Sequence, residues 1–270
     1  MSTATLTLSN TQIQRSPVHT VEIYLKEIKY EFLKNLRLRV YTASVLSFPI
    51  MFYIFFGLLM KNQTIGATRM PTYLIATYGT FGIMGASLFG TAAGLSSDRG
   101  LGWLQVKRAS PMPPFAYFIA KIVTCMVFST IIVLSLIALG ITLGGVRMPV
   151  ITFAQLLGTL VIGSLPFSAM GLALGYFTGP NSAPSMINLM YLPMSFCSGL
   201  WVPLMFLPKA LRQFALVLPP YHLSQLALGT VGAGTREAAS THWGVLLGFT
   251  MICLGVARIG FQRDQGKLYG

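Results

Sequence analysis

Side chains able to carry out chemistry are few in this sequence and lie far apart. The 270 residues include six carboxylates, three histidines and three cysteines. The histidines are His19, His222 and His242, and none has a second His or Cys at metal-ligand spacing. The sequence holds no GxxxxGK[ST] phosphate loop, no HExxH zinc motif and no GxSxG nucleophile motif. We therefore expect no catalytic residue and no metal site in this chain.

One dense group of charges stands between two long apolar runs, at residues 96–114. Its members are Asp98, Arg99, Lys107 and Arg108. The apolar run before the group carries no charge, and the run after it carries only Lys121. A short charged helix of this kind can dock a soluble protein or bind anionic lipid headgroups. The chemistry that the sequence offers is therefore binding rather than catalysis.

The composition limits the protein class. Hydrophobic residues make up 54% of the chain and charged residues only 9%, with a mean hydropathy of +0.68. A soluble domain has about 25% charged residues, so this chain lacks the charge to cover a water-facing surface. The net charge of +13 comes from basic residues that flank apolar runs, as the membrane orientation rule requires. The sequence indicates a polytopic membrane protein, with membrane lipids around it and no nucleic-acid partner.

The apolar runs predict an all-α fold with six transmembrane helices. We expect the spans at about residues 41–60, 71–95, 115–143, 151–177, 185–206 and 243–257. The turn between spans four and five is TGPNSAP, rich in Gly, Pro and Asn. Between spans five and six, prolines divide an apolar stretch into pieces too short to span, which predicts re-entrant or interfacial half-helices. These prolines are Pro203, Pro208, Pro219 and Pro220.

A helix-forming segment precedes the first span. Its apolar residues recur on one helical face: Val21, Leu25, Ile28, Phe32 and Leu36. Mixed acidic and basic residues cover the other faces, so we predict an amphipathic helix at the cytosolic membrane surface. A helix docked on a soluble partner is the alternative. The predicted organisation is a tail with this helix over 1–40, a six-span domain over 41–260 and a tail over 261–270.

Two glycine pairs have GxxxG spacing inside predicted spans. The pairs are Gly90 with Gly94 and Gly171 with Gly175. Small residues let helices approach closely in lipid, so we expect helix contacts there; a flexible wall of a transport pathway is the alternative. Lys121 lies one to two turns inside the third span. We expect it to extend back to the headgroups rather than to contact a substrate.

The distribution of basic residues predicts the orientation. Of the 19 Lys and Arg residues, 12 lie on the side of the termini and six on the other, with Lys121 counted on neither. The excess places both termini and residues 96–114 in the cytosol.

In combination, these features resemble the type-2 permease family of bacterial ABC exporters. The order of the amphipathic helix, six spans, charged loop and proline-broken half-helices is similar. In the loop, the spacing of the family is matched by Asp98, Arg99, Gly102, Leu104 and Pro111. Gly100 and Gln105 stand where the family has acidic residues. Before the last span, Pro219 replaces an Asn of the family pattern, and Gly229 lies near the place of its Arg.

The resemblance implies a non-enzymatic membrane subunit that works as a homodimer with two cytosolic ATPase subunits. ATP and Mg would be bound by those partners, and this chain would hold no cofactor. Residues 98–111 would be the coupling helix, which contacts the ATPase through Asp98, Arg99, Gly102, Trp103, Leu104, Lys107, Arg108 and Pro111. Trp103, Leu104 and Val106 would fill a groove, and the basic residues would pair with its acidic rims. Lipid binding is the alternative for Lys107 and Arg108.

The expected function is ATP-driven export of a hydrophobic or amphiphilic molecule across the bacterial inner membrane, as in multidrug efflux or lipid transport. No carboxylate lies in a predicted span, which disfavours an ion-coupled secondary carrier. A permease for lipid-linked polysaccharide and a non-transporting scaffold or sensor subunit are the alternatives.

Overall fold

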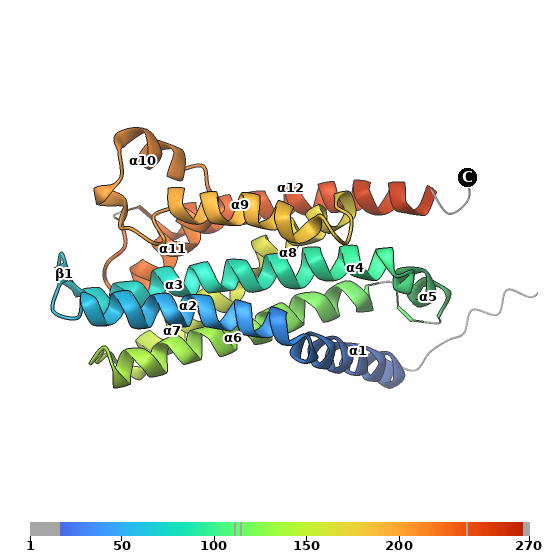
Figure 1. Ribbon diagram of the computed structural model, residues 1–270, viewed down its shortest axis with the longest axis horizontal. Helices are drawn as coiled ribbons and strands as arrows, with labels where there is room; N and C mark the ends of the chain where they lie inside the picture. The colour runs from blue at the N-terminus through green and yellow to red at the C-terminus, as the bar shows by residue number, and fades with distance from the viewer. Residues whose placement is uncertain (1–16, 111, 114, 236, 267–270) are drawn as a thin grey trace, which may run out of the picture.

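The computed structural model describes residues 17–110, 112–113, 115–235 and 237–266. Long helices run roughly along one axis, and the ends of α1 and α12 that are nearest the chain termini lie at the same end of the molecule (Figure 1). The described strands are two two-residue segments that pair antiparallel in a hairpin, Thr64 with Arg69 and Ile65 with Thr68. The predicted all-α fold is thereby confirmed.

The elements follow one another with short connections. In chain order they are α1 (Pro17–Arg37), α2 (Arg39–Leu59), β1 (Thr64–Ile65), β2 (Thr68–Arg69), α3 (Met70–Leu88), the π-helical turn η1 (Phe89–Ala93), α4 (Gly94–Gly100), α5 (Trp103–Ala109), α6 (Ala116–Thr142), α7 (Val150–Ile162), α8 (Ser164–Phe177), α9 (Ala183–Cys197), the 3-10 turn η2 (Leu204–Phe206), α10 (Lys209–Ala215), α11 (Pro219–Thr230) and α12 (Ala239–Gly266).

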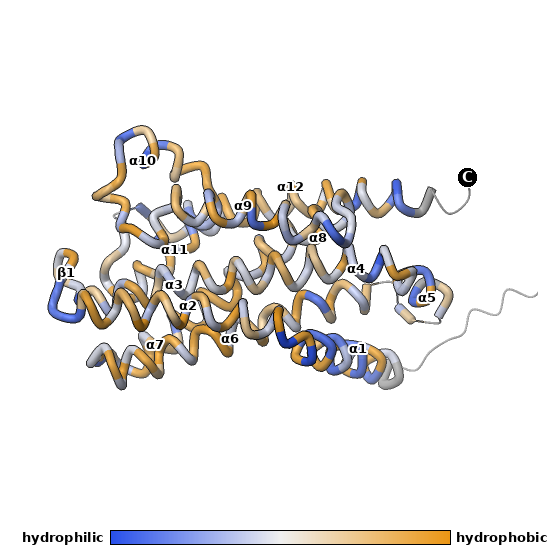
Figure 2. The backbone as a smooth tube through the Cα atoms, in the orientation of Figure 1, coloured by the Kyte–Doolittle hydropathy of each residue, from blue (hydrophilic) through white to orange (hydrophobic). Residues whose placement is uncertain are grey.

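Five helical stretches among the described residues are long and apolar enough to cross a membrane. They are Arg39–Leu59, Met70–Gly100, Ala116–Thr142, Val150–Phe177 and Ala239–Asp264. Hydrophobic residues dominate the middle of the bundle, and hydrophilic residues gather at α1 and α5 and at the β1 tip (Figure 2). The protein is therefore a helical membrane protein with several spans.

The predicted span at 185–206 differs from the helix that forms there. Helix α9 has 15 residues and rises about 22 Å, which is less than the roughly 30 Å of a bilayer core. It ends because Gly199 turns the chain with a φ of +74° and Pro203 follows shortly after. A sixth crossing and the membrane depth of α9, α10 and α11 remain predictions.

The proline-rich stretch before α12 forms two short helices, as the spacing of prolines suggested. Pro208 is the N-cap residue of α10, and Pro219 begins α11. Proline is tolerated at these positions because the first backbone N–H groups of a helix have no partner within the helix. Helix α11 packs among α3, α7 and α12, and ten of its residues are buried.

Helix α3 is the centre of the bundle. All of its residues are buried, and it contacts α2, α6, α8 and α11. A helix that is apolar on every side is stable only when other elements surround it. It continues through η1 into α4, so that one path of 31 residues joins the two ends of the molecule.

Glycines permit the close approach of α8 to this central path. A Cβ atom on Gly171 would lie 1.8 Å from Thr91 Oγ1, and one on Gly175 would lie 2.9 Å from Leu95 Cβ. On another side, a Cβ on Gly90 would lie 2.8 Å from Cys125 Sγ of α6. The two GxxxG pairs thus lie at helix contacts.

The Gly171 contact generates a stability prediction. Gly171→Ala forces α8 away from η1 and should destabilise the fold by about 1–3 kcal/mol. Gly158→Ala in α7 is the matched control, because no atom lies within 4 Å of the added Cβ. Thermal unfolding of the detergent-solubilised variants measures both effects. Equal melting temperatures for the two variants would contradict the close packing.

Candidate functional site

The charged segment predicted at 96–114 forms a corner between two short helices. Helix α4 carries Asp98 and ends at Gly100, and α5 begins at Trp103. Gly102 makes the corner with a φ of +74°, a conformation that residues with a Cβ atom adopt only with strain. Pro111 and the side chain of Arg108 lie outside the described residues.

Helix α5 presents one apolar face outward and one inward. Trp103 and Val106 are 55% and 60% exposed, whereas Leu104 is 5% exposed. Leu104 packs in a small core with Leu95 and Tyr117. Residues 103 and 106 share a helical face and residue 104 points away from it. Leu104 therefore belongs to the chain's own core, contrary to the expectation that it fills a groove on a partner.

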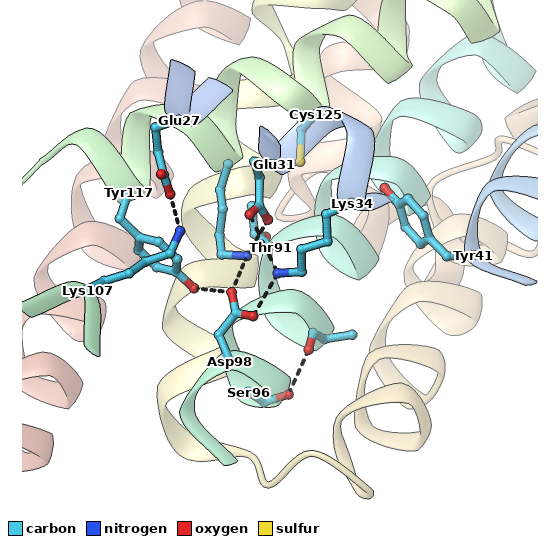
Figure 3. A network of polar contacts seen from close by, with 12 residues as sticks. Glu27, Glu31, Lys34, Tyr41, Thr91, Ser96, Asp98, Lys107, Tyr117 and Cys125 are labelled. Atoms are coloured by element: carbon cyan, nitrogen blue, oxygen red, sulfur yellow. Dashed lines mark hydrogen bonds and ion pairs between the residues drawn. The ribbon is translucent and has the colours of Figure 1, made fainter. Parts of the chain in front are cut away.

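A buried cluster of alternating charges lies behind this corner (Figure 3). Lys121 Nζ lies 2.7 Å from Glu31 Oε1 and 3.1 Å from Asp98 Oδ2. Lys34 Nζ lies 2.7 Å from Asp98 Oδ1 and 3.5 Å from Glu31 Oε2. The Tyr117 hydroxyl donates a hydrogen bond of 2.8 Å to Asp98 Oδ2. Two carboxylates and two ammonium groups, from α1, α4 and α6, thus balance one another.

The prediction that Lys121 extends to the headgroups is wrong. The side chain is fully buried and points inward to the carboxylates of α1 and α4. An unpaired buried ammonium costs several kcal/mol, so the lysine is stable there only because two carboxylates face it. Space comes from Gly94, where a Cβ would lie 2.9 Å from Lys121 Nζ.

The cluster also shifts the protonation of Glu31. Burial by itself raises the pKa of this carboxyl, but the charges of Lys121 and Lys34 outweigh burial and hold the pKa below its usual value. Glu31 is therefore ionised at neutral pH and stabilises the buried lysine.

Helix α1 faces the bundle with polar residues and turns much of its apolar stripe outward. Glu31 and Asn35 are buried, whereas Val21, Leu25 and Leu36 are exposed. The rest of the stripe lies nearer the bundle: Ile28 is half-buried, and the ring of Phe32 lies 5.6 Å from that of Phe128. Ion pairs inside and apolar residues outside are an arrangement suited to contact with lipid.

The other cations of the segment are paired within the chain. Lys107 of α5 forms an ion pair with Glu27 of α1. Arg99 Nη2 lies 2.8 Å from Asp264 Oδ1, and Arg99 Nη1 donates to the backbone oxygens of Gly175 and Tyr176 at 2.8 and 2.9 Å. Arg99 thus joins α4 to the end of α8 and to α12. Arg99 and Lys107 hold the corner in place, which differs from the expected pairing with acidic rims on a partner.

Two histidines that are 20 residues apart meet at the other end of the bundle. His222 Nδ1 lies 2.9 Å from His242 Nδ1, and His222 Nε2 lies 2.9 Å from the backbone oxygen of Leu216. The carbonyl requires a proton on His222 Nε2, so a neutral His222 accepts a hydrogen bond from His242 Nδ1. No local sequence pattern predicts that these two histidines lie in contact. Among the described residues, no group of three His, Cys, Asp or Glu side chains could hold a metal ion.

Several apolar spans and an exposed corner supported by a charged cluster define a helical membrane protein with a surface suited to binding at one end. A family model described as ABC-2 type transporter matches residues 27–231, and this chain belongs to that family. It is 21% identical over 215 residues to "Putative transport permease YvfS" of Bacillus subtilis (strain 168), and the match covers 80% of this chain and 88% of that protein. The chain is thus a transporter permease subunit, and membership of the family implies association with an ABC ATPase.

Removal of the central cation should destabilise the protein strongly. Lys121→Met removes the cation that lies between the Glu31 and Asp98 carboxylates. The free energy of unfolding should therefore fall by about 3–5 kcal/mol. Adding Glu31→Gln and Asp98→Asn to this variant should restore most of the loss. Unfolding in denaturant measures all variants, with the exposed Lys26→Met as control. A triple variant as unstable as the single one would contradict the charge-balance explanation.

The Glu31 pKa predicts an acid sensitivity. A lowered pKa stabilises the folded protein above about pH 4.5, and this contribution is lost as the pH falls through the lower pKa of the folded state. Melting temperatures between neutral pH and about pH 3.5 should therefore fall less steeply for Glu31→Gln than for the unmodified chain. Glu22→Gln, at an exposed surface pair, should leave the slope unchanged; equal slopes for all three would argue against the role of Glu31.

Proposed function

We propose that this permease is the membrane half of an ATP-driven exporter and that its α4–α5 corner docks on the ATPase. The observation that carries the proposal is the exposed apolar face of α5, supported from behind by buried ion pairs. Two permease copies and two ATPase subunits would form the transporter, with ATP and Mg bound by the ATPases.

The docking face consists of apolar side chains that the chain itself leaves uncovered. Trp103, Val106 and Leu101 of the corner are all more than half exposed. A large aromatic residue with aliphatic neighbours is a typical anchor for a pocket on a partner protein. Since the nearby described cations are paired within the chain, we propose that apolar contact dominates the docking.

The ion pairs provide a route by which motion of the ATPase reaches the membrane. Lys107 joins α5 to α1, Lys121 joins α1 to α6, and Arg99 joins α4 to α8 and α12. Of these links, Lys121–Glu31 is buried, and breaking a buried pair costs about 3–5 kcal/mol. Displacement of α5 should therefore move α1 and α6 together. The π-helical turn η1 follows next to α4 along the same path, and turns of this kind are frequent at functional sites.

We infer that the protein lies in the bacterial inner membrane and that its charged end faces the cytosol. Basic residues are enriched at that end, which favours the cytosolic side. The ends of α1 and α12 that are nearest the termini lie there too (Figure 1). The exposed residues Val21, Leu25 and Leu36 would rest in the lipid surface.

We propose that the substrate is hydrophobic or amphiphilic, such as a drug or a lipid. The support is a group of aromatic rings between α2, α3 and the segment after α9. Phe52 lies 5.5 Å from Trp201 and 6.1 Å from Phe81, measured between ring centroids. Aromatic surfaces without ionised groups suit an apolar molecule.

Mutation of the docking face tests the proposal. The double variant Trp103→Ala and Val106→Ser should lose the co-expressed ATPase on purification and lose ATP-dependent transport of a lipophilic dye in vesicles. Its melting temperature should be unchanged because both side chains are exposed.

The matched control is Met205→Ser with Phe206→Ala, two exposed apolar residues near the opposite end. It should keep the ATPase bound. Full retention of the ATPase by the Trp103 and Val106 variant would refute docking at α5. Retained docking without any nucleotide-dependent transport would instead favour a scaffold or sensor subunit.

A further inference from the structure

A cavity of about 590 Å³ lies at the end of the bundle opposite α5. Three chain segments form it: the β2–α3 junction, the α6–α7 connection and the residue after α11. The lining residues that matter here are Thr68, Arg69, Thr72, Gly145, Arg147 and Val231. Its volume falls within the range of about 300–1,000 Å³ that is usual for small-molecule sites.

The cavity is lined by two arginines without a counter-charge. Neither Arg69 nor Arg147 forms a salt bridge with a described residue, and no carboxylate lines the cavity. Five of the six carboxylates lie at the α5 end: Glu22, Glu27, Glu31, Asp98 and Asp264. The sixth, Glu237, lies 3.6 Å from His242. The described lining of the cavity therefore carries two positive charges and no negative charge.

Arg69 is tethered across the cavity but retains unused donors. Its Nη1 donates a hydrogen bond of 3.0 Å to the backbone oxygen of Gly145, which joins the hairpin to the α6–α7 connection. A guanidinium has five N–H donors, and no other donor of this one has a described partner. The backbone holds the head group in place while the other donors remain available for an anion.

Thr72 contributes a hydroxyl that forms no hydrogen bond with a described residue. The residue is 8% exposed and lines the cavity. Further along the central path, Thr80 and Thr91 each bond to the carbonyl four residues earlier. For Thr72 the carbonyl four residues earlier belongs to Thr68. Thr68 lies in β2, before the helix begins, so its carbonyl is not placed as it would be in a preceding helical turn.

The start of α3 adds a favourable field for negative charge. Thr72 stands in the first helical turn, where Pro71 occupies one of the first positions. Backbone N–H groups in a first turn lack partners within the helix, and the helix dipole is positive there. The central path of 31 residues therefore points its positive end at the cavity.

We propose that this cavity binds a phosphate group, and specifically the phosphate of a membrane lipid headgroup. Arginine pairs with phosphate oxygens through two parallel hydrogen bonds, and a hydroxyl beside a helix N-terminus supplies a further donor. The cavity lies where an apolar stretch long enough to span a membrane begins, at Met70, and the end of such a stretch would lie near the lipid headgroups. The site does not depend on the identity of the transported molecule.

Binding is measured by the rise in melting temperature of the purified chain in detergent. The probes are dioctanoyl phosphatidylglycerol, dioctanoylglycerol, which lacks the phosphate, and inorganic phosphate. Phosphatidylglycerol should raise the melting temperature and dioctanoylglycerol should not. An effect of inorganic phosphate equal to that of the lipid would support the phosphate site but overturn the assignment to a lipid.

Variants locate the binding in the cavity. Arg147→Gln and Arg69→Gln should each weaken phosphatidylglycerol binding about tenfold, because each removes hydrogen bonds to a charged group. Arg212→Gln, an exposed arginine of α10 at the same end, is the control and should bind normally. Normal binding by Arg147→Gln would overturn the proposal, as would an equal loss in the control.

Thr72→Val separates ligand binding from a structural role. Because the hydroxyl has no partner among the described residues, the variant should melt at the same or a higher temperature than the original chain when no lipid is added. The stabilisation by phosphatidylglycerol should nevertheless decrease. A lower melting temperature without lipid, with unchanged stabilisation by lipid, would show that the hydroxyl serves the fold and would overturn its part in the site.

Discussion

The charged end of this permease depends on one buried lysine. Lys121 cannot be solvated at its position, so Glu31 and Asp98 must approach it from two other helices. That requirement brings α1, α4 and α6 together at one point, and it explains the position of Gly94, which leaves room for the ammonium group. Lys34 and Tyr117 then complete the balance of charge and hydrogen bonds around Asp98.

The same constraint orients the proposed docking surface. With its polar residues drawn inward to the lysine, α1 turns Val21, Leu25 and Leu36 outward. Lys107 of α5 is bound to α1, so that Trp103 and Val106 face away from the bundle. Helix α5 is short and would be marginal alone; its contacts with α1 and α6 give it a defined direction.

Helix α3 links this charged end to the opposite one. It is buried on all sides and continues through η1 into α4, so it separates two sites of different chemistry. Balanced ion pairs surround its continuation at the charged end, and two arginines without an ion-pair partner among the described residues lie where it begins. The proposed ATPase contact and the proposed phosphate site are thus at opposite ends of one continuous helical path.

Local patterns in the sequence were sufficient to predict several features of the structure. Apolar run lengths identified a membrane protein and five of its long helices, because hydrocarbon thickness sets the length that a span needs. The isolated charges at 96–114 pointed to the corner, since charge is rare in this chain. The GxxxG spacing predicted the close helix contacts, because a glycine lets helices approach closely simply by having no side chain.

Only the tertiary structure decided which charges meet. Lys121 and Glu31 are 90 residues apart, and Lys34 and Asp98 are 64 apart, so no helical period relates them. From sequence alone, Lys121 was expected at the headgroups and Leu104 on a partner; both lie inside, because burial depends on which helices surround a position. Periodicity and composition therefore determined the elements and the membrane class, whereas the solvation of buried charge, a property of the assembled bundle, determined the site.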